Sequence, residues 1–260
     1  MAIKFIKCPA CNSKSFRNLG KPIESEINSI YSVIECNECK LNWCSPMPSH
    51  EDLNNYYTRY YKTRYSTVDK YPLKTKIKSI VTLRKTRLKS FFSIIQQYSP
   101  GKSILDFGCG EADILYVAKE KGWKVLGVDY SNELRDKFKS DNIEFKCGSD
   151  LESVGIEKNS FSCISAKHVI EHIPEIENFL NSIKQCLTPN GIFAVKTPSA
   201  SSNRAKFGLA NWHLVRPMEH FWGFIIDNFG RLMKKNNFEI LYMKDNLLVD
   251  ELTCVARVVN

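Results

Sequence analysis

Apolar and polar residues follow two different rhythms along the chain from residue 103 onward. Short runs rich in Ile, Val, Leu and Phe have the length and composition of buried strands. The stretches between them repeat apolar residues about every three to four positions, as amphipathic helices do. The predicted strands are 103–107, 124–128, 143–147, 161–166, 191–196, 238–244 and 252–259. The predicted helices are 112–121, 131–140, 176–187 and 219–236.

Strands separated by helices are typical of the α/β class. The series therefore predicts a doubly wound, mostly parallel seven-stranded sheet with helices on both faces. The last two strands follow each other without a helix between them, which predicts an antiparallel pair at the end of the sheet. In such a sheet, ligands bind beyond the carboxyl ends of the strands.

Residues suited to ligand binding follow the first two strands of this series, in DFGCGEAD and GVDYS. Gly108 and Gly110 allow a sharp turn and a close approach of the backbone to a ligand. Asp129 ends the second strand, where a carboxylate can accept both hydroxyl groups of an adenosine ribose. The two loops together predict a site for an adenosine-containing ligand.

The charge of the first loop narrows the ligand further. A dinucleotide-binding motif has its third glycine where this chain has Asp113, and a carboxylate there would repel a pyrophosphate. The loop therefore disfavours NAD and favours an adenosine ligand with positive charge. S-adenosylmethionine meets this description, and Asp106 lies on the same loop to face its cationic groups.

Four cysteines near the N-terminus form two Cys-x-x-Cys pairs, Cys8 with Cys11 and Cys36 with Cys39. Two such turns supply the tetrahedral thiolate set that Zn²⁺ prefers, and a fully thiolate-bound ion is expected to be structural. A redox dithiol is the alternative, but it would not need two pairs. The other cysteines are expected to be core residues: Cys44, Cys109, Cys147, Cys163, Cys186 and Cys254.

The segment after the cysteine pairs carries helix and aromatic signals. Ser49, with Asp52 three residues later, resembles a capping box at the start of a short helix. A tyrosine cluster follows, and we expect it to pack this segment onto the main domain, with a pocket lining as the alternative. The cluster consists of Tyr56, Tyr57, Tyr60, Tyr61 and Tyr65.

Much of the formal net charge of +9 gathers in residues 73–98. Apolar residues recur there at spacings of about three and four, which predicts an amphipathic helix with a basic outer face. A solvated helix face is the first interpretation. A surface that attracts the phosphates of a nucleotide-linked or nucleic-acid substrate is the alternative.

The stretch ILDFGCGEAD resembles motif I of class I S-adenosylmethionine-dependent methyltransferases. This resemblance implies that Asp106, Gly108 and Gly110 bind the cofactor. It also implies that Asp129, with Tyr130 beside it, holds the ribose.

Later stretches extend the resemblance. GSDLES matches the loop after the third strand of the family, which implies that Asp150 and Leu151 frame the adenine. The stretch from FSCISAKHVIEH to KTPS is similar to the region that follows the motifs, so Lys167 and His168 are expected to border the methionine part of the cofactor.

The N-terminal part, from CPAC to DLNNYY, is similar to the zinc-ribbon start of a bacterial subgroup associated with surface-polysaccharide and sugar methylation. Two departures from the family pattern occur in the larger domain. Ala112 replaces the third glycine of motif I, a mild change because alanine is small. Ser162 replaces an aspartate that the family uses structurally rather than as a ligand.

Methyl transfer to oxygen or carbon also requires a base with a pKa near neutral, for which histidine is suited. His172 follows the fourth strand and His220 precedes the last predicted helix. Both are candidate catalytic residues, as a base or an acceptor contact, with structural roles as the alternatives. Trp212 and His213 lie in a variable insertion and could contact substrate.

These motifs divide the chain into a zinc ribbon (1–48), a helical linker or cap (49–98) and a methyltransferase domain (99–260) with a substrate-cap insertion at about 199–220. No apolar run reaches the roughly 18–20 residues that span a bilayer. The N-terminus lacks the apolar centre of a signal peptide, so a cytoplasmic protein is expected.

Three functions are compatible with these features of the sequence. The first is an S-adenosylmethionine-dependent methyltransferase that modifies oxygen or carbon of a sugar or nucleotide-linked sugar. The second is an rRNA or tRNA base methyltransferase with the ribbon as substrate module, which the basic helix supports but the lack of an Asn-Pro-Pro-Tyr base-flipping motif opposes. The third is a non-catalytic scaffold that keeps the fold, which the intact acidic and glycine residues of the loops oppose.

Overall fold

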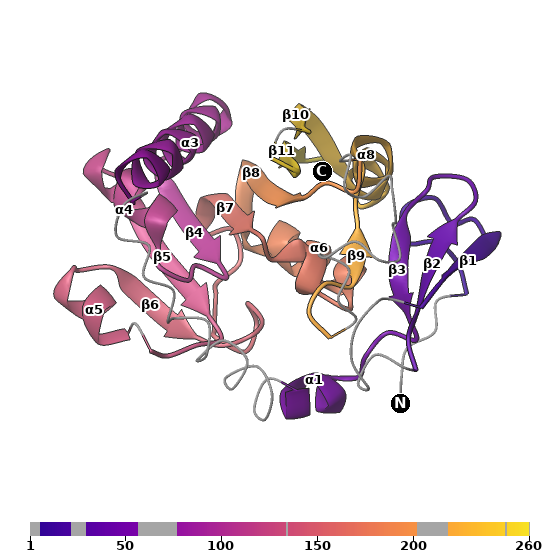
Figure 1. Ribbon diagram of the computed structural model, residues 1–260. Helices are drawn as coiled ribbons and strands as arrows, with labels where there is room; N and C mark the ends of the chain where they lie inside the picture. Colours follow the sequence, from indigo (N-terminus) through magenta and orange to yellow (C-terminus); the bar gives the residue numbers. More distant parts are fainter. Residues whose placement is uncertain are drawn as a thin grey trace.

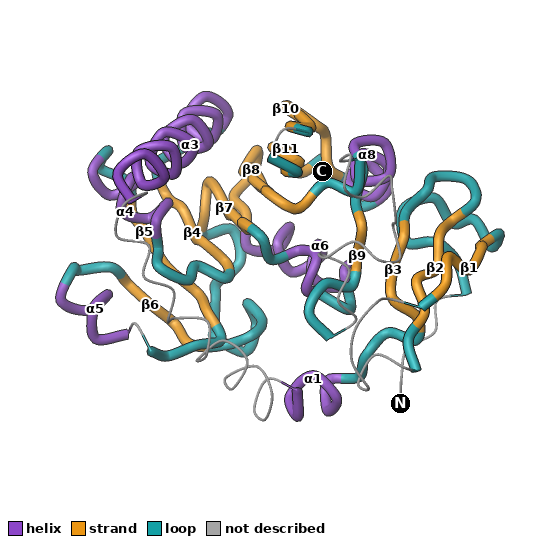
Figure 2. The backbone as a smooth tube through the Cα atoms, viewed as in Figure 1, coloured by secondary structure: helices purple, strands orange, loops and turns teal. Residues whose placement is uncertain are grey.

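The computed structural model describes residues 6–21, 30–56, 77–133, 135–201, 218–247 and 249–259 (Figures 1 and 2). Its strands are β1 (Phe16–Gly20), β2 (Ser32–Cys36), β3 (Asn42–Ser45), β4 (Ser103–Phe107), β5 (Lys124–Asp129), β6 (Glu144–Cys147), β7 (Phe161–Lys167), β8 (Leu187–Pro198), β9 (Trp222–Gly223), β10 (Phe238–Asn246) and β11 (Glu251–Val258). Its helices are α1 (His50–Tyr56), α3 (Ile77–Tyr98), α4 (Asp113–Glu120), α5 (Arg135–Ser140), the 3-10 helix η4 (Ile170–His172), α6 (Ile176–Cys186) and α8 (Ile226–Lys235). Of the residues named above, the ones outside the described ranges are Tyr57, Tyr60, Tyr61, Tyr65, Trp212 and His213.

The larger sheet has seven strands in the order β10-β11-β8-β7-β4-β5-β6. The neighbours from β8 to β6 are parallel, and β11 is antiparallel to both β8 and β10. The predicted α/β fold with a mostly parallel seven-stranded sheet is therefore confirmed. The chain runs outward from β4 to β6 and returns on the other side of β4 with β7, which places the switch point for ligand binding at the carboxyl ends of β4 and β7.

Helices cover both faces of this sheet, as the alternation of strands and helices predicts. On one face, α3 and α4 contribute Phe91 and Leu115 to a buried cluster that also holds Phe138 of α5. On the other face, α6 and α8 contribute Leu180 and Phe229 to a second buried cluster. Burial of apolar area on both faces fixes the sheet as a rigid support for the loops at its edge.

The smaller sheet joins the N-terminal strands to a segment near the C-terminus. Its order is β1-β2-β3-β9, and Trp43 of β3 pairs with Trp222 of β9 (Figure 1). The rings of these tryptophans have centroids 6.4 Å apart. A Cβ on Gly223 would lie 1.9 Å from Asn42 Oδ1, so the two strands approach too closely for any side chain there. The N-terminal strands thus share a sheet with a segment that precedes α8.

The predicted helix 219–236 is wrong at its N-terminal end. Helix α8 begins at Ile226, and Trp222 lies in β9 instead. Trp222 is 5% exposed, and its indole N–H donates a 2.7 Å hydrogen bond to Ile173 O. A tertiary partner, the edge of β3, decides the conformation of this segment, which helical spacing does not reveal.

The predicted helix 131–140 is also too long, because α5 begins at Arg135. The backbone N–H of Ser131 donates to Asp129 Oδ1 over 2.9 Å, so Ser131 belongs to the turn after β5 rather than to a helix cap. The prediction that Cys147 is a core residue is wrong as well. It is exposed because it ends β6, the outermost strand of the sheet.

The short helix α1 begins as predicted. Asp52 N–H donates to Ser49 Oγ over 3.2 Å and Ser49 N–H donates to Asp52 Oδ2 over 2.9 Å, which forms the capping box of α1. Tyr56 packs with Met218 and donates a 2.5 Å hydrogen bond to a carboxylate oxygen of Glu219. This tyrosine therefore joins the linker to the segment before β9.

Helix α3 is amphipathic over the part whose side chains are described. Leu88, Phe92 and Ile95 are buried, whereas Arg87 and Lys89 are exposed. The prediction of a helix with a basic outer face is confirmed for this part. Among the described residues, none of the helices is long and apolar enough to cross a membrane.

Candidate active site

Asp106 lies close to the carboxyl end of β4. Its side chain is buried and accepts a 2.6 Å hydrogen bond from Ser165 Oγ of β7. Burial raises the pKa of Asp106 to about 7, and the nearby carboxylates of Asp129 and Asp113 add to this rise. A carboxyl group with a pKa near neutrality ionises readily when a cation binds beside it.

The turn after β4 uses its two glycines differently. Gly108 has φ +68°, and a Cβ there would lie 2.4 Å from Val169 Cγ2, so the fold leaves no room for a side chain. Gly110 has φ +45° and nothing within 4 Å of a Cβ position, so it borders open space. Ala112, in place of the third glycine, adopts φ 56°. This left-handed conformation costs roughly 1–2 kcal/mol for a residue with a side chain, so the replacement is less mild than its size suggests.

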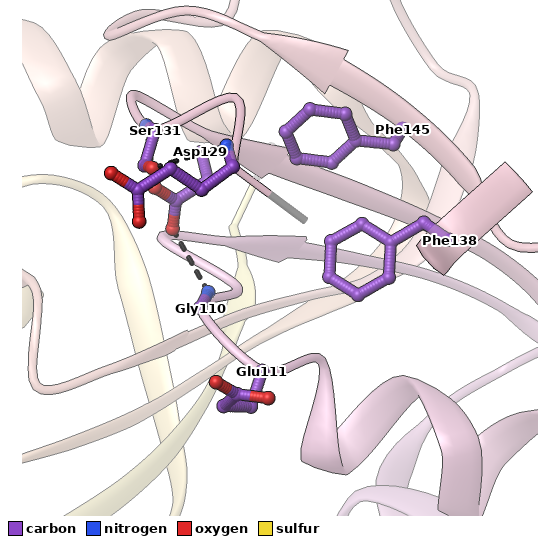
Figure 3. Close-up of a pocket in the computed structure, with 7 residues that line it drawn as sticks. Gly110, Glu111, Asp129, Ser131, Phe138 and Phe145 are labelled. Atoms are coloured by element: carbon purple, nitrogen blue, oxygen red, sulfur yellow. Dashed lines mark hydrogen bonds between the residues drawn. The ribbon is translucent and has the colours of Figure 1, made fainter. Parts of the chain in front are cut away.

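Asp129 connects the loops that follow β4 and β5 (Figure 3). Its Oδ2 accepts a 2.9 Å hydrogen bond from Gly110 N–H, and its Oδ1 accepts one of 2.9 Å from Ser131 N–H. Carboxylate oxygens have further lone pairs, so both can still accept bonds from ligand hydroxyls. The structure thus brings together the predicted Gly110 and Asp129.

A cavity of about 220 Å³ lies beside Asp129. Its lining residues are Gly110, Glu111, Asp129, Ser131, Glu133, Phe138 and Phe145. The rings of Phe138 and Phe145 have centroids 5.3 Å apart and lie opposite the carboxylate (Figure 3). Phe145 is half-buried and presents the surface of this apolar wall, whereas Phe138 is only 1% exposed and supports it. One polar rim and one aromatic wall are suited to a nucleoside, whose ribose is polar and whose base is flat and aromatic.

Three more residues predicted to contact the adenosine lie outside the lining of this cavity. Both Asp150 carboxylate oxygens already accept 2.7 Å hydrogen bonds from Ser153, which lower the pKa of Asp150. Leu151 is buried in the core, and Tyr130 is 63% exposed. Asp150 and Tyr130 are therefore accessible from solvent, whereas Leu151 presents little surface to a ligand.

Lys167 ends β7 and His168 follows it, at the switch point. Lys167 Nζ lies 3.8 Å from Asp113 Oδ2, so the first residue of α4 carries an ion pair. His168 Nε2 lies 3.4 Å from Glu251 Oε2, and Glu251 also pairs with Lys196. Partial burial lowers the pKa of His168, but its carboxylate neighbours outweigh this effect and raise it to about 9.

The structure also brings together the two candidate catalytic histidines. His172 and His220 make an edge-to-face contact with ring centroids 4.5 Å apart. His172 Nδ1 lies 2.6 Å from Glu219 O, so it donates its proton to this carbonyl and leaves Nε2 as an acceptor. Phe221 N–H donates to Glu171 O over 2.7 Å, which ties the His220 segment to η4.

The four N-terminal cysteines also converge. Their Sγ atoms lie within 4.8 Å of one another, with Cys8–Cys39 and Cys11–Cys36 separations of 3.5 Å. Thiolates bound at about 2.3 Å to a tetrahedral zinc ion are about 3.8 Å apart, so the cluster fits this ion closely. The residue after each pair of cysteines has a positive φ of about 60° (Asn12 and Lys40), which closes each turn.

Several residues that line the cavity were not predicted from the sequence. Phe138 and Phe145 have the periodicity of core residues in a helix and a strand, and Glu111 and Glu133 resemble solvated loop residues. Ser131 stands in a sequence that also fits a helix cap.

Ser162, in place of the family aspartate, accepts a 3.0 Å hydrogen bond from Ser103 N–H, so the hydroxyl keeps a structural role at the start of β4.

Comparison with known proteins extends these observations. A family model described as a methyltransferase domain matches residues 83–243. The chain is 29% identical over 123 residues to the ubiquinone biosynthesis O-methyltransferase of Coxiella burnetii, covering 45% of this chain and 51% of that protein. The corresponding protein of Bradyrhizobium diazoefficiens is 30% identical over 116 residues, covering 42% and 44%. The chain thus spans about half the length of these curated relatives.

Solved structures share the fold. The 1,6-didemethyltoxoflavin-N1-methyltransferase of Burkholderia thailandensis superposes with a TM-score of 0.58 at 13% identity, over 91% of this chain and 99% of that chain. An S-adenosylmethionine-dependent methyltransferase of Mesorhizobium loti superposes with a TM-score of 0.53 at 15% identity, over 66% and 96%. With its Rossmann-like sheet, its glycine turn and its matching family model, the chain belongs to the methyltransferase-domain family and has the fold of S-adenosylmethionine-dependent methyltransferases.

Proposed function

We propose that this chain transfers a methyl group from S-adenosylmethionine to an oxygen atom of a small molecule. The observation that carries the proposal is the position of Asp129, which links Gly110 to Ser131 at the rim of a cavity with an aromatic wall. In the proposed complex, Asp129 accepts hydrogen bonds from the ribose hydroxyls, and Phe145 contacts the adenine with Phe138 packed against it. Asp106 and Asp113 supply negative charge toward the sulfonium and the amino group.

We further propose that the other residues predicted at the cofactor site border the cofactor. Lys167 and His168 would face its methionine part. Tyr130 and Asp150 would cover the adenosine from the solvent side, with Leu151 supporting the loop from the core. These roles rest on the resemblance of the sequence to motif I and the stretches after it.

The acceptor is proposed to lie against the His172–His220 pair. The acceptor oxygen attacks the methyl carbon in line with the sulfur, and the C–S electron pair stays on sulfur to give S-adenosylhomocysteine. The hydroxyl proton passes to an imidazole nitrogen of the pair. Alignment of acceptor, methyl and sulfur is the main contribution of the protein, because the donor is already activated.

We propose a sugar or a nucleotide-linked sugar as the acceptor. The N-terminal stretch supports this class through its similarity to sugar-type methyltransferases. The relatives named as O-methyltransferases and the structural neighbour that binds 1,6-didemethyltoxoflavin support oxygen chemistry and a small acceptor, respectively. The four-cysteine cluster is proposed to hold a structural zinc ion.

A turnover assay with labelled S-adenosylmethionine and a panel of sugars and nucleotide sugars tests the proposal. We expect label in one class of acceptor, with mass spectrometry showing one added methyl group on oxygen. His220→Ala should lower turnover far more than cofactor affinity. Equal losses in both would place His220 outside the acceptor site, and label in RNA with a steep salt dependence would replace the sugar by a nucleic acid.

A further inference from the structure

Glu171 of η4 is a buried carboxylate that the proposed chemistry has not yet used. Its side chain is 1% exposed, and Oε2 accepts a 2.9 Å hydrogen bond from Thr197 Oγ1. Within the described residues, Oε1 has no hydrogen-bond partner. A buried carboxylate oxygen without a partner costs free energy, so its retention points to a function.

Histidines surround this oxygen. Oε1 lies 3.7 Å from His168 Nδ1 and 3.9 Å from His172 Nε2. One ring nitrogen of His220 also lies within 4.8 Å of the nearest Glu171 and His172 ligand atoms. Burial raises the pKa of Glu171, but these three histidines lower it below its ordinary value, so the carboxylate is ionised at neutral pH.

Building on the proposed function, we propose that Glu171 is a positioning residue for proton removal. Its negative charge stabilises the imidazolium that forms when the His172–His220 pair takes the proton of the acceptor hydroxyl. Oxygen then forms the bond to the methyl carbon, sulfur keeps the C–S electron pair, and the imidazolium later releases its proton to water. Glu171 acts by charge at a distance, because 3.9 Å is beyond hydrogen-bond range.

The surrounding charges keep this arrangement in balance. His168 lies between Glu171 and Glu251, and Glu251 also pairs with Lys196. On the other side, the Glu219 carboxylate accepts a hydrogen bond from Tyr56. The carbonyl of Glu219 accepts the Nδ1 proton of His172, which fixes the ring with Nε2 toward Glu171. Removal of the charge at Glu171 therefore leaves His168 paired with Glu251 and takes the negative charge away from the His172–His220 side.

The variant Glu171→Gln tests this role, because glutamine keeps an oxygen for Thr197 and removes the charge. We expect the acid limb of the kcat–pH profile to move down by about one pH unit and kcat to fall by about tenfold. The dissociation constant of S-adenosylmethionine should stay within about twofold. Glu175→Gln, an exposed carboxylate four residues later, is the matched control and should leave both quantities unchanged.

Histidine NMR supplies a readout that does not need turnover. Titration of the His168 imidazole, whose pKa the neighbouring carboxylates of Glu171 and Glu251 raise to about 9, should show a lower pKa in Glu171→Gln than in the wild type, and Glu171→Asp should restore most of the difference. Unchanged imidazole titrations in a folded Glu171→Gln protein would overturn the proposal. Activation of the wild type by added Mn²⁺ would also overturn it if this activation were lost in Glu171→Gln, because Glu171 would then be a cation ligand.

Failure of the proposed function would have a different signature. A wild-type protein that binds no S-adenosylmethionine, or methylates nothing, would remove the reaction but leave the imidazole titrations as a test of the charge relation. A wild type that turns over with a pH profile insensitive to Glu171→Gln would keep the reaction and remove the role of Glu171.

Discussion

Asp106 shows how a single buried residue can couple cofactor binding to pH. The ordinary pKa of an aspartate is 3.8, and burial raises the pKa of Asp106 to about 7 in the ligand-free protein. Below pH 7 the folded protein therefore holds a proton on this group. The sulfonium and amino group of S-adenosylmethionine favour the ionised form, so binding should expel that proton.

We predict that the affinity for S-adenosylmethionine rises from pH 6 to pH 7 by up to about tenfold and levels off near pH 8. Calorimetry in two buffers with different ionisation enthalpies should detect proton release at pH 6.5 that disappears at pH 8.5. Asp106→Asn should bind more weakly and without this pH dependence. A wild-type affinity that stays flat from pH 6 to pH 8, or an equal slope in Asp106→Asn, would show that another group titrates.

Some residues of the candidate site can be predicted from the sequence, and others only from the folded structure. Gly110 and Asp129 follow apolar strands directly, so local pattern and strand order suffice to place them together. Phe138 has the periodicity of a core residue, and only the folded structure shows that it also lines a cavity. Glu171 resembles a solvated helix residue, but packing of the β9 segment against η4 buries it.

Strand β9 is the element through which the N-terminal strands contact the proposed acceptor site. Cys44 N–H donates a 3.0 Å hydrogen bond to Phe221 O, and Cys44 Sγ lies 3.5 Å from His220 O. His220 is therefore held directly by the third strand of the ribbon. The cofactor loops follow β4 and β5 in the other sheet and make no backbone hydrogen bond to β3 among the described residues.

Loss of the proposed zinc ion should therefore damage turnover and spare cofactor binding. We expect Cys39→Ser, or removal of the ion with a chelator, to lower kcat at least about tenfold, since a misplacement of about 1 Å can cost about 100-fold. Affinity for S-adenosylmethionine should change less than about twofold. Cys147→Ser, an exposed cysteine outside the cluster, is the control and should resemble the wild type.

Metal analysis and calorimetry on the same samples separate the outcomes. One zinc ion per wild-type chain and none in Cys39→Ser would support the four-cysteine site. A parallel loss of cofactor affinity would show that the ribbon supports the whole domain rather than the acceptor side alone. Full turnover without zinc would show that β3 holds His220 without help from the ion.

Helices and strands that local interactions form can be predicted from the sequence, whereas those that depend on tertiary contacts cannot. Strands β4, β5, β6 and β7 and helices α4 and α6 arise from local periodicity, and their predicted bounds agree closely with the structure. Strand β8 begins at Leu187, four residues before its predicted start. Strand β9 has only two residues and exists because β3 pairs with it, so no local pattern announces it. The same reasoning applies to α5, whose start depends on the hydrogen bond between Ser131 and Asp129.

Over the whole molecule, the sheet places two kinds of chemistry at one edge. The proposed cofactor loops follow β4 and β5, and the histidines lie beyond β7 and before β9, so the proposed methyl donor and acceptor can meet at the switch point. Strand β3 pairs with β9 next to the histidine side (Figure 1). The proposed reaction depends first on whether the glycine turn and Asp129 hold S-adenosylmethionine.

Calorimetric titration of S-adenosylmethionine into the wild type, Gly110→Ala and Gly122→Ala tests this claim most directly. Gly110 and Gly122 both have positive φ and open space at the Cβ position, so alanine adds similar strain, but only Gly110 lines the cavity. We predict one binding site per chain in the wild type, an affinity at least about tenfold weaker in Gly110→Ala, which is about 1.4 kcal/mol, and wild-type affinity in Gly122→Ala. No heat with the wild type, or equal affinities in all three proteins, would contradict the account.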